Sequence, residues 1–229
     1  MVAYVMIRLR PLLLLFAGLA ATPLTAEPQS FNFKGFGADV GRMTLNIAAD
    51  GAHWLDSQTD NMPFGFLNGT YVARTDLQRG VGNRSFLADR IAADGDTRYY
   101  RLAFSGDTVT ETVIKPAADL TEMSDITRID RPVASPLEAL VSLFDLSRCG
   151  ETRSFYDGRR IVDITLSPPE PEGENSVCKG RYEIVAGPGH GGIVGLKDLP
   201  LTLTFDGEGT LQRIATRLLF FRVAAERVE

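Results

Sequence analysis

The chain has 229 residues, of which 44% are hydrophobic, and it carries a formal net charge of −5. A single domain of this size buries a sizeable core without metal ions or a dense set of disulfides. The acidic balance argues against the basic surface that nucleic acids and anionic membranes attract, so we expect neither as a partner.

The first predicted element is an N-terminal leader. Two arginines precede an apolar run over residues 12–21, and a Leu-Thr-Ala step follows as a cleavage site. This order is typical of a secretory signal peptide, and the run is too short to span a bilayer comfortably. We therefore predict a signal peptide over residues 1–26 and a single β-rich domain over residues 27–229. The expected location is the periplasm, without stable insertion into a membrane.

Four Asp-Gly steps divide the rest of the chain into short segments. Asp-Gly suits the positive φ angles of tight hairpin turns. Residues 43–47, 100–104, 162–166 and 201–205 each alternate apolar and polar side chains. A period of two indicates strands with one packed face and one solvent face, as in antiparallel sheets. The sequence therefore predicts a mainly β fold.

A polar stretch over residues 115–134 contains two prolines and is predicted to be a crossing loop. Further along, residues 187–192 are rich in glycine. We interpret them as a mobile hairpin loop and not as a phosphate-binding loop, because a strand-like segment and not a helix follows. Because one segment is polar and the other is rich in glycine, we expect both to be able to move and to open an entrance to the interior of the sheet.

One helix is predicted within this β pattern, beginning at Pro136. Ser135 and Glu138 match a capping box, and apolar residues then recur at helical spacing as far as Phe144. Because the helix is apolar around most of its girth, we expect it to be largely buried, with Leu140 and Phe144 deep in the core. The predicted fold is a curved antiparallel sheet or partly closed β-barrel wrapped around this one main α-helix.

The two cysteines of the chain, Cys149 and Cys178, both lie in the part predicted to be exported. An even number of cysteines in an oxidising compartment favours a disulfide. We predict a bond that ties the C-terminal end of the helix to a later strand.

No catalytic, cofactor or metal site is predicted. The two histidines, His53 and His190, are assigned to different loops without cysteine or acidic neighbours at ligand spacing. A zinc site needs three or four such ligands. No Gly-x-Ser-x-Gly nucleophile motif occurs either. We therefore expect that the protein is not an enzyme.

Three short motifs carry a resemblance to a known family. They are a Ser-Pro-Leu helix start at Ser135, an aromatic-Asp-Gly-basic hairpin over residues 155–160, and a strand with Gly180 and Tyr182. In these motifs the chain resembles the exported family catalogued as domain of unknown function 3108. The resemblance implies a mostly β protein of the cell envelope with no established activity and no catalytic residues to carry over. By fold analogy it also implies a likeness to periplasmic lipoprotein carriers, which hold acyl chains.

Two functions fit these features. The first is a non-catalytic binding module whose interior holds a lipid-like ligand or a hydrophobic peptide segment, or which docks an envelope partner. Leu140, Phe144, Phe33 and Trp54 are the candidates for the lining of its apolar cavity. The second is a structural or interaction protein with a filled core and no small-molecule ligand. An apolar pocket favours the first and a core at normal packing density favours the second, while the oligomeric state stays open.

Overall fold

The computed structural model describes residues 28–35, 37–48, 51–60, 68–78, 83–190, 196–218 and 221–228. The predicted signal peptide over residues 1–26 lies outside the described residues, as do residues 191 and 192 of the predicted glycine-rich loop. In the described part of the chain, no helix is both long enough and apolar enough to span a membrane.

The described residues contain one antiparallel sheet of 14 strands, which confirms the mainly β prediction. Most strands pair with the next strand in the chain, and the three described Asp-Gly steps lie in the turns between such pairs. The strands are β1 (Gln29–Gly35), β2 (Ala38–Ile47), β3 (His53–Thr59), β4 (Gly69–Gln78), β5 (Asn83–Ala92), β6 (Thr97–Ser105), β7 (Thr108–Lys115), β8 (Thr152–Tyr156), β9 (Ile161–Leu166), β10 (Glu170–Glu172), β11 (Asn175–Ala186), β12 (Asp198–Phe205), β13 (Leu211–Leu218) and β14 (Phe221–Arg227).

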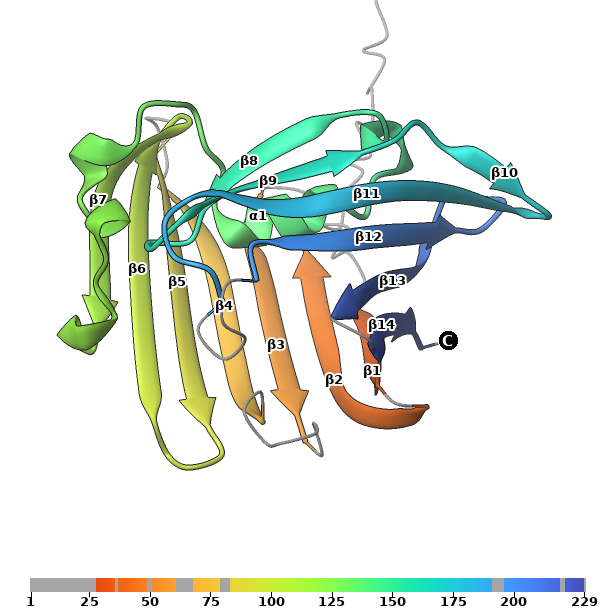
Figure 1. Ribbon diagram of the computed structural model, residues 1–229, viewed down its shortest axis with the longest axis horizontal. Helices are drawn as coiled ribbons and strands as arrows, with labels where there is room; N and C mark the ends of the chain where they lie inside the picture. Colours follow the sequence, from red (N-terminus) through yellow and green to blue (C-terminus); the bar gives the residue numbers. More distant parts are fainter. Residues whose placement is uncertain are drawn as a thin grey trace, which may run out of the picture.

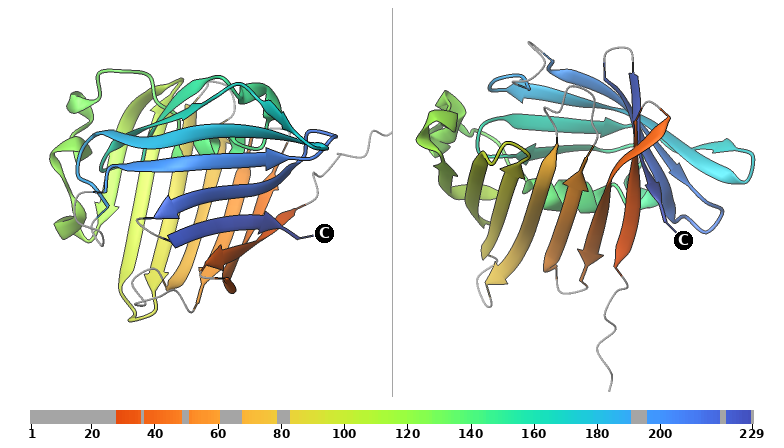
Figure 2. Two further views of the ribbon diagram at one scale, coloured as in Figure 1. Left: turned by 45° about the vertical axis from the view of Figure 1, so that its right-hand side comes forward. Right: turned by 90° about the horizontal axis from the view of Figure 1, so that it is seen from below.

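The sheet folds into two halves that face each other. Strands β1–β7 form the first half, strands β8–β14 form the second half, and pairing of β1 with β14 joins them. Figures 1 and 2 show the two halves as layers whose strands cross. Because β7 and β8 stand at opposite ends of the strand order and do not pair, the sheet is not a closed barrel.

Apolar and polar side chains alternate along the strands, and the apolar ones form the core between the two halves. In the first half, Leu45, Leu55 and Ala73 are neighbours in register and are all buried. In the second half, Val162 and Ile164 are buried in the same hydrophobic cluster. Both halves therefore turn their apolar faces toward a shared interior and their polar faces outward.

The predicted helix is present as α1 (Pro136–Ser142), and it lies between the two halves (Figure 1). Its capping box forms as expected: the Ser135 hydroxyl accepts from the Glu138 N–H at 3.3 Å, and Glu138 Oε2 accepts from the Ser135 N–H at 2.9 Å. The helix is only 7 residues long, and the sheet does not encircle it. The expectation of a sheet wrapped around the helix therefore holds only in part.

The deep burial expected for Leu140 and Phe144 is wrong. Both side chains are half-buried, whereas Leu137 is 2% exposed and Ala139 is 1% exposed. The ion pair of Glu138 with Arg84 on β5, at 2.6 Å, fixes the rotation of the helix about its axis. This rotation leaves Leu140 and Phe144 at the border of the core, where Phe144 packs edge-on against Phe31 at a ring distance of 5.5 Å.

The predicted crossing loop over residues 115–134 is more ordered than expected. It contains three 3₁₀ turns, η1 (Ala117–Asp119), η2 (Glu122–Ser124) and η3 (Ile126–Arg128). Thr121 and Ser124 donate hydrogen bonds of 2.9 and 2.8 Å to backbone carbonyls of the β8–β9 turn. The segment therefore fastens the end of the second half to the first half and covers the β7 edge of the sheet, which is a common protection for an edge strand.

The predicted cysteine pair lies at disulfide distance. Cys149 follows the turn η4 (Leu146–Arg148), and its Cα lies 6.0 Å from that of Cys178 on β11. Cys178 is fully buried, so the bond enters the core from the segment that follows α1.

Reduction of this disulfide should lower the free energy of unfolding by about 3–4 kcal/mol, because the bond closes a loop of 29 residues and restricts the unfolded chain. Urea unfolding of the oxidised and the fully reduced protein measures the difference. Coincident unfolding midpoints, with both thiols shown to be free by alkylation, would contradict this expectation.

Leu137→Ala should cost about 2–5 kcal/mol of stability, the range for a buried leucine. Leu140→Ala should cost less, because the Leu140 side chain is only half-buried. Urea unfolding of both variants provides the comparison, with each acting as the control for the other. An equal loss for the two would show that the helix is rotated differently from the arrangement described.

Candidate functional site

The β8–β9 turn is built to place charged residues inside the molecule. Asp157 Oδ1 accepts hydrogen bonds of 2.9 Å from the backbone N–H groups of both Arg159 and Arg160, which is a common turn-forming role for aspartate. Gly158 has a φ of 94°, and a Cβ there would lie 3.1 Å from Ile114 on β7. Only glycine therefore allows the tip of this turn to rest against the inner face of the first half.

Asp157 and Arg160 form an ion pair that is partly shielded from solvent. Arg160 Nε lies 2.8 Å from Asp157 Oδ2; Arg160 is buried, and the Asp157 side chain is 24% exposed. Burial raises the pKa of the Asp157 carboxyl, and the neighbouring Arg160 opposes this rise. An ion pair in such a position seldom stabilises a protein more than an apolar pair of the same volume, so its presence needs another explanation.

His190 and Tyr182 extend this pair into a chain of hydrogen bonds. Arg160 Nη1 donates to His190 Nδ1 at 3.0 Å, and because arginine has no acceptor, Nδ1 carries no proton. The neutral ring then carries its proton on Nε2 and donates to the Tyr182 hydroxyl oxygen at 3.1 Å. Burial, followed by the charge of Arg160, lowers the pKa of His190 to about 4.

Tyr71 approaches the same place from β4. Its side chain packs against the core from the inside, as does that of Tyr182 on β11. Burial raises the pKa of both phenols, and the negative charge of Asp157 raises it further in each. Tyr71 and Tyr182 therefore stay protonated near neutral pH and act as hydrogen-bond donors. We call the set of Tyr71, Asp157, Arg160, Tyr182 and His190 the polar cluster.

Tyr156 lies beside the polar cluster but has a structural role. Its hydroxyl lies 2.7 Å from the Met123 carbonyl oxygen, 2.9 Å from that of Gly158 and 3.2 Å from Thr112 Oγ1. Burial raises its pKa to about 12. These contacts fasten the crossing segment and β7 to the β8–β9 turn.

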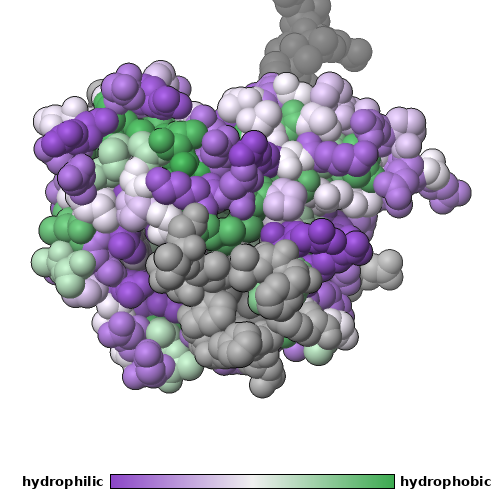
Figure 3. All heavy atoms as spheres, viewed as in Figure 1, coloured by the Kyte–Doolittle hydropathy of each residue, from purple (hydrophilic) through white to green (hydrophobic). Residues whose placement is uncertain are grey.

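The four predicted lining residues are not brought together as a set. Phe33, Leu140 and Phe144 are half-buried and pack against the core. Trp54 is 50% exposed, so its assignment to the lining is wrong. In β3 the side chain of Leu55 points inward, and its neighbour Trp54 must therefore point outward. A single exposed aromatic residue on a protein surface is common. On the face drawn in Figure 3, the coloured hydrophobic and hydrophilic residues are mixed.

The histidines also differ from expectation. His53 is the first residue of β3 and does not lie in a loop. His190 belongs to the polar cluster, which the sequence reasoning missed. The signal that pointed to this cluster was the aromatic-Asp-Gly-basic hairpin, because this motif supplies Asp157 and Arg160. Among the described residues, no group of three or more His, Cys, Asp or Glu is placed to hold a metal ion.

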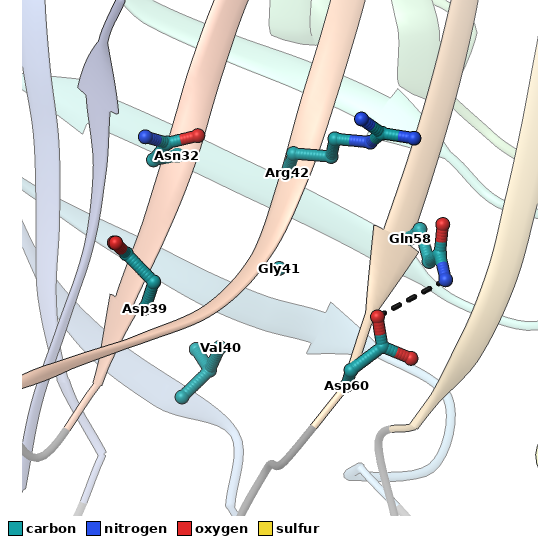
Figure 4. Close-up of a pocket in the computed structure, with 7 residues that line it drawn as sticks. All are labelled: Asn32, Asp39, Val40, Gly41, Arg42, Gln58 and Asp60. Atoms are coloured by element: carbon teal, nitrogen blue, oxygen red, sulfur yellow. Dashed lines mark hydrogen bonds between the residues drawn. The ribbon is translucent and has the colours of Figure 1, made fainter.

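A hollow with a volume of about 430 Å³ lies on the outward face of β1–β3. Figure 4 shows its lining, in which Asn32, Arg42 and Gln58 are neighbours in register above the bare backbone of Gly41. The other lining residues are Asp39, Val40 and Asp60. The hollow is mostly polar and lies on the outside, so it is not the predicted apolar cavity.

Comparisons with known proteins add little to this description. The chain matches no family model and no curated protein. It is similar to a solved structure described as a beta-barrel-like protein of domain of unknown function DUF1849 from Brucella abortus, with a TM-score of 0.47 and 9% identity over 88% of this chain and 95% of that chain. The resemblance to family 3108 and the periplasmic location stay predictions.

Stability should depend on pH through His190. Its pKa of about 4 in the folded protein lies below the ordinary value of 6.5, so the unfolded chain binds the proton more tightly. The stabilisation is complete above pH 6.5 and is lost as the pH falls toward 4. Because the His190 ring is half-buried and partly screened by solvent, we expect the free energy of unfolding to fall by about 1–2 kcal/mol over this pH range.

Urea unfolding at several pH values across this window, in the wild type and in His190→Gln, measures the effect. The variant should lose that part of the pH dependence, while the contributions of Asp157 and other carboxyls remain in both proteins. Parallel stability curves for the two proteins would show that His190 is not held in its neutral form.

Proposed function

We propose that this protein is an exported, non-catalytic binding module that holds an apolar, lipid-like ligand between the two halves of its sheet. The observation that supports this most directly is the change from apolar to polar side chains along the inward face. Most of that face is apolar, but at one end it carries the polar cluster of Tyr71, Asp157, Arg160, Tyr182 and His190. An amphipathic ligand has the same two parts, an apolar body and a polar end.

An apolar inner wall runs without interruption from one half of the sheet to the other. Phe33 on β1 is paired in register with Ala225 on β14, which is paired with Ile214 on β13, and Ile214 is paired with Leu203 on β12. Phe33 and Ile214 are half-buried although they pack against the core. Half-buried apolar side chains on an inward face offer contact area to an apolar ligand.

Export is supported by the leader pattern over residues 1–26 and by the cysteine pair, because disulfides persist mainly in oxidising compartments. The resemblance to the exported family 3108 agrees with this location. These features make the cell envelope, and in particular the periplasm, the location that we propose.

A structural or interaction protein with a filled core is the second candidate. One observation favours it: large side chains such as Tyr156, Phe31 and Phe205 are fully buried between the halves, together with Leu137 of α1. If such packing extends through the whole interior, no apolar ligand has room to enter.

Titration with a fluorescent fatty-acid probe separates the two candidates. We expect saturable binding that lipid extract displaces, and a co-purifying lipid in native mass spectrometry of the protein from its own periplasm. Phe33→Ala should weaken probe binding about tenfold, because it removes apolar contact area from the inner wall. Trp54→Ala removes an aromatic residue from the outer face and is the matched control, with unchanged binding expected. The absence of saturable binding by the folded protein would leave the structural role as the better description.

A further inference from the structure

We infer that the polar end of the interior is a binding site for an anionic head group, a carboxylate or a phosphate, held by arginine and tyrosine donors. This inference rests on the proposed function, because the head group belongs to the ligand whose apolar body lies between the halves. It adds a chemical class for the ligand, which neither the fold nor the apolar wall specifies.

The first half of the sheet places positive charge on its inward face. Ser57, Tyr71, Arg90 and Arg98 are consecutive neighbours in register across β3, β4, β5 and β6. They share the inward face with Met43, which is paired with Ser57 and is 5% exposed. Inward-pointing charged side chains are costly to bury, so packing alone does not account for this row.

The β8–β9 turn adds two more arginines at the same end. Arg98 Nε lies 2.8 Å from Asp119 Oδ2, whereas Arg159 Nη1 lies 4.0 Å from Asp119 Oδ1. Asp119 is thus shared by two guanidinium groups, and Asp157 is paired with Arg160. Arg98, Arg159 and Arg160 therefore carry one more positive charge than these two carboxylates neutralise.

Hydrogen-bond donors also exceed acceptors at this end. Three buried guanidinium nitrogens at this end make no hydrogen bond within the described residues, namely Nε of Arg98, Arg159 and Arg160, against one buried acceptor, Asp119 Oδ2. Arg98 Nε and Arg160 Nε each lie 2.8 Å from a carboxylate oxygen, so Arg159 Nε is the one of the three without a close carboxylate. Among the described residues, the hydroxyl of Tyr71 has no hydrogen-bond partner, and that of Tyr182 has only His190, whose ring donates to it. The protons of both tyrosine hydroxyls are therefore without an acceptor in the described part of the chain.

The shortage of acceptors points to the chemistry of the missing group. Buried polar groups in folded proteins nearly always have partners, so the buried Arg159 Nε next to excess positive charge favours an acceptor that is itself negatively charged. Carboxylate and phosphate oxygens accept several hydrogen bonds at once, and guanidinium groups bind both. A fatty acid and a phosphate-bearing lipid share this chemistry.

Three ligands that share one hydrocarbon chain and differ only in the head group test the inference. Displacement of a neutral fluorescent probe by hexadecanoic acid, hexadecyl phosphate and hexadecanol gives the three affinities. We expect the acid or the phosphate to bind about tenfold more tightly than the alcohol, because only they carry a charge for the arginines. The tighter of the two anions identifies the head group.

Variants locate the site. Arg159→Gln should weaken binding of the preferred anion about tenfold and leave binding of the alcohol unchanged, and Tyr71→Phe should weaken the anion about threefold by removing one hydroxyl. Arg74→Gln changes an arginine on the outward face of β4 and is the matched control, with no effect expected. If Arg159→Gln does not fold, Tyr71→Phe still decides the outcome, because it removes a single oxygen.

The outcomes separate the two proposals. Equal affinity for the anions and the alcohol, or an equal loss for every ligand in Arg159→Gln and Tyr71→Phe, would overturn the head-group site while the apolar binding role stands. If none of the three ligands displaces the probe and none binds, the proposed function fails and the head-group site fails with it.

Discussion

The pairing of β1 with β14 is the constraint on which the rest of the structure depends. It joins the first described strand to the last, so that the sheet folds back and the inward faces of its halves meet in one core. Phe31 on β1 points into this shared core, where it packs against Phe144 and is fully buried. The two ends of the sheet, β7 and β8, do not pair with each other, and other contacts must hold them.

The contacts that hold β7 and β8 together at the open side of the sheet also place polar residues in the interior. Unpaired strand edges are a liability, and here the crossing segment lies against β7 while Ala134 bridges to β8. The crossing segment brings Asp119 to Arg98, and the β8–β9 turn carries Asp157 and Arg160 inside. Apolar residues of similar volume would close the same gap at lower cost in desolvation. The ligand-binding role that we propose would give these charges a function that stability alone does not require.

Much of the fold, and one part of the site, can be predicted from the sequence. Alternating side chains and Asp-Gly steps predict antiparallel strands, and the Ser135–Glu138 capping box predicts where α1 begins, because both signals depend on residues close in the chain. The failed predictions concern orientation. Trp54 points outward because its strand neighbour Leu55 is the one that packs in, and Leu140 is only half-buried because the distant Arg84 fixes the rotation of the helix.

The sequence by itself determined the local elements: the leader pattern, the alternating strands, the capped helix, the turn at Gly158 and a pair of cysteines able to bond. Only the tertiary structure decided that Tyr71, Arg160, Tyr182 and His190 come together, because they lie on separate elements. It also decided that the sheet stays open between β7 and β8. The physical reason is that hairpin turns and periodicity act over a few residues, whereas the polar cluster depends on pairing between the first and last strands.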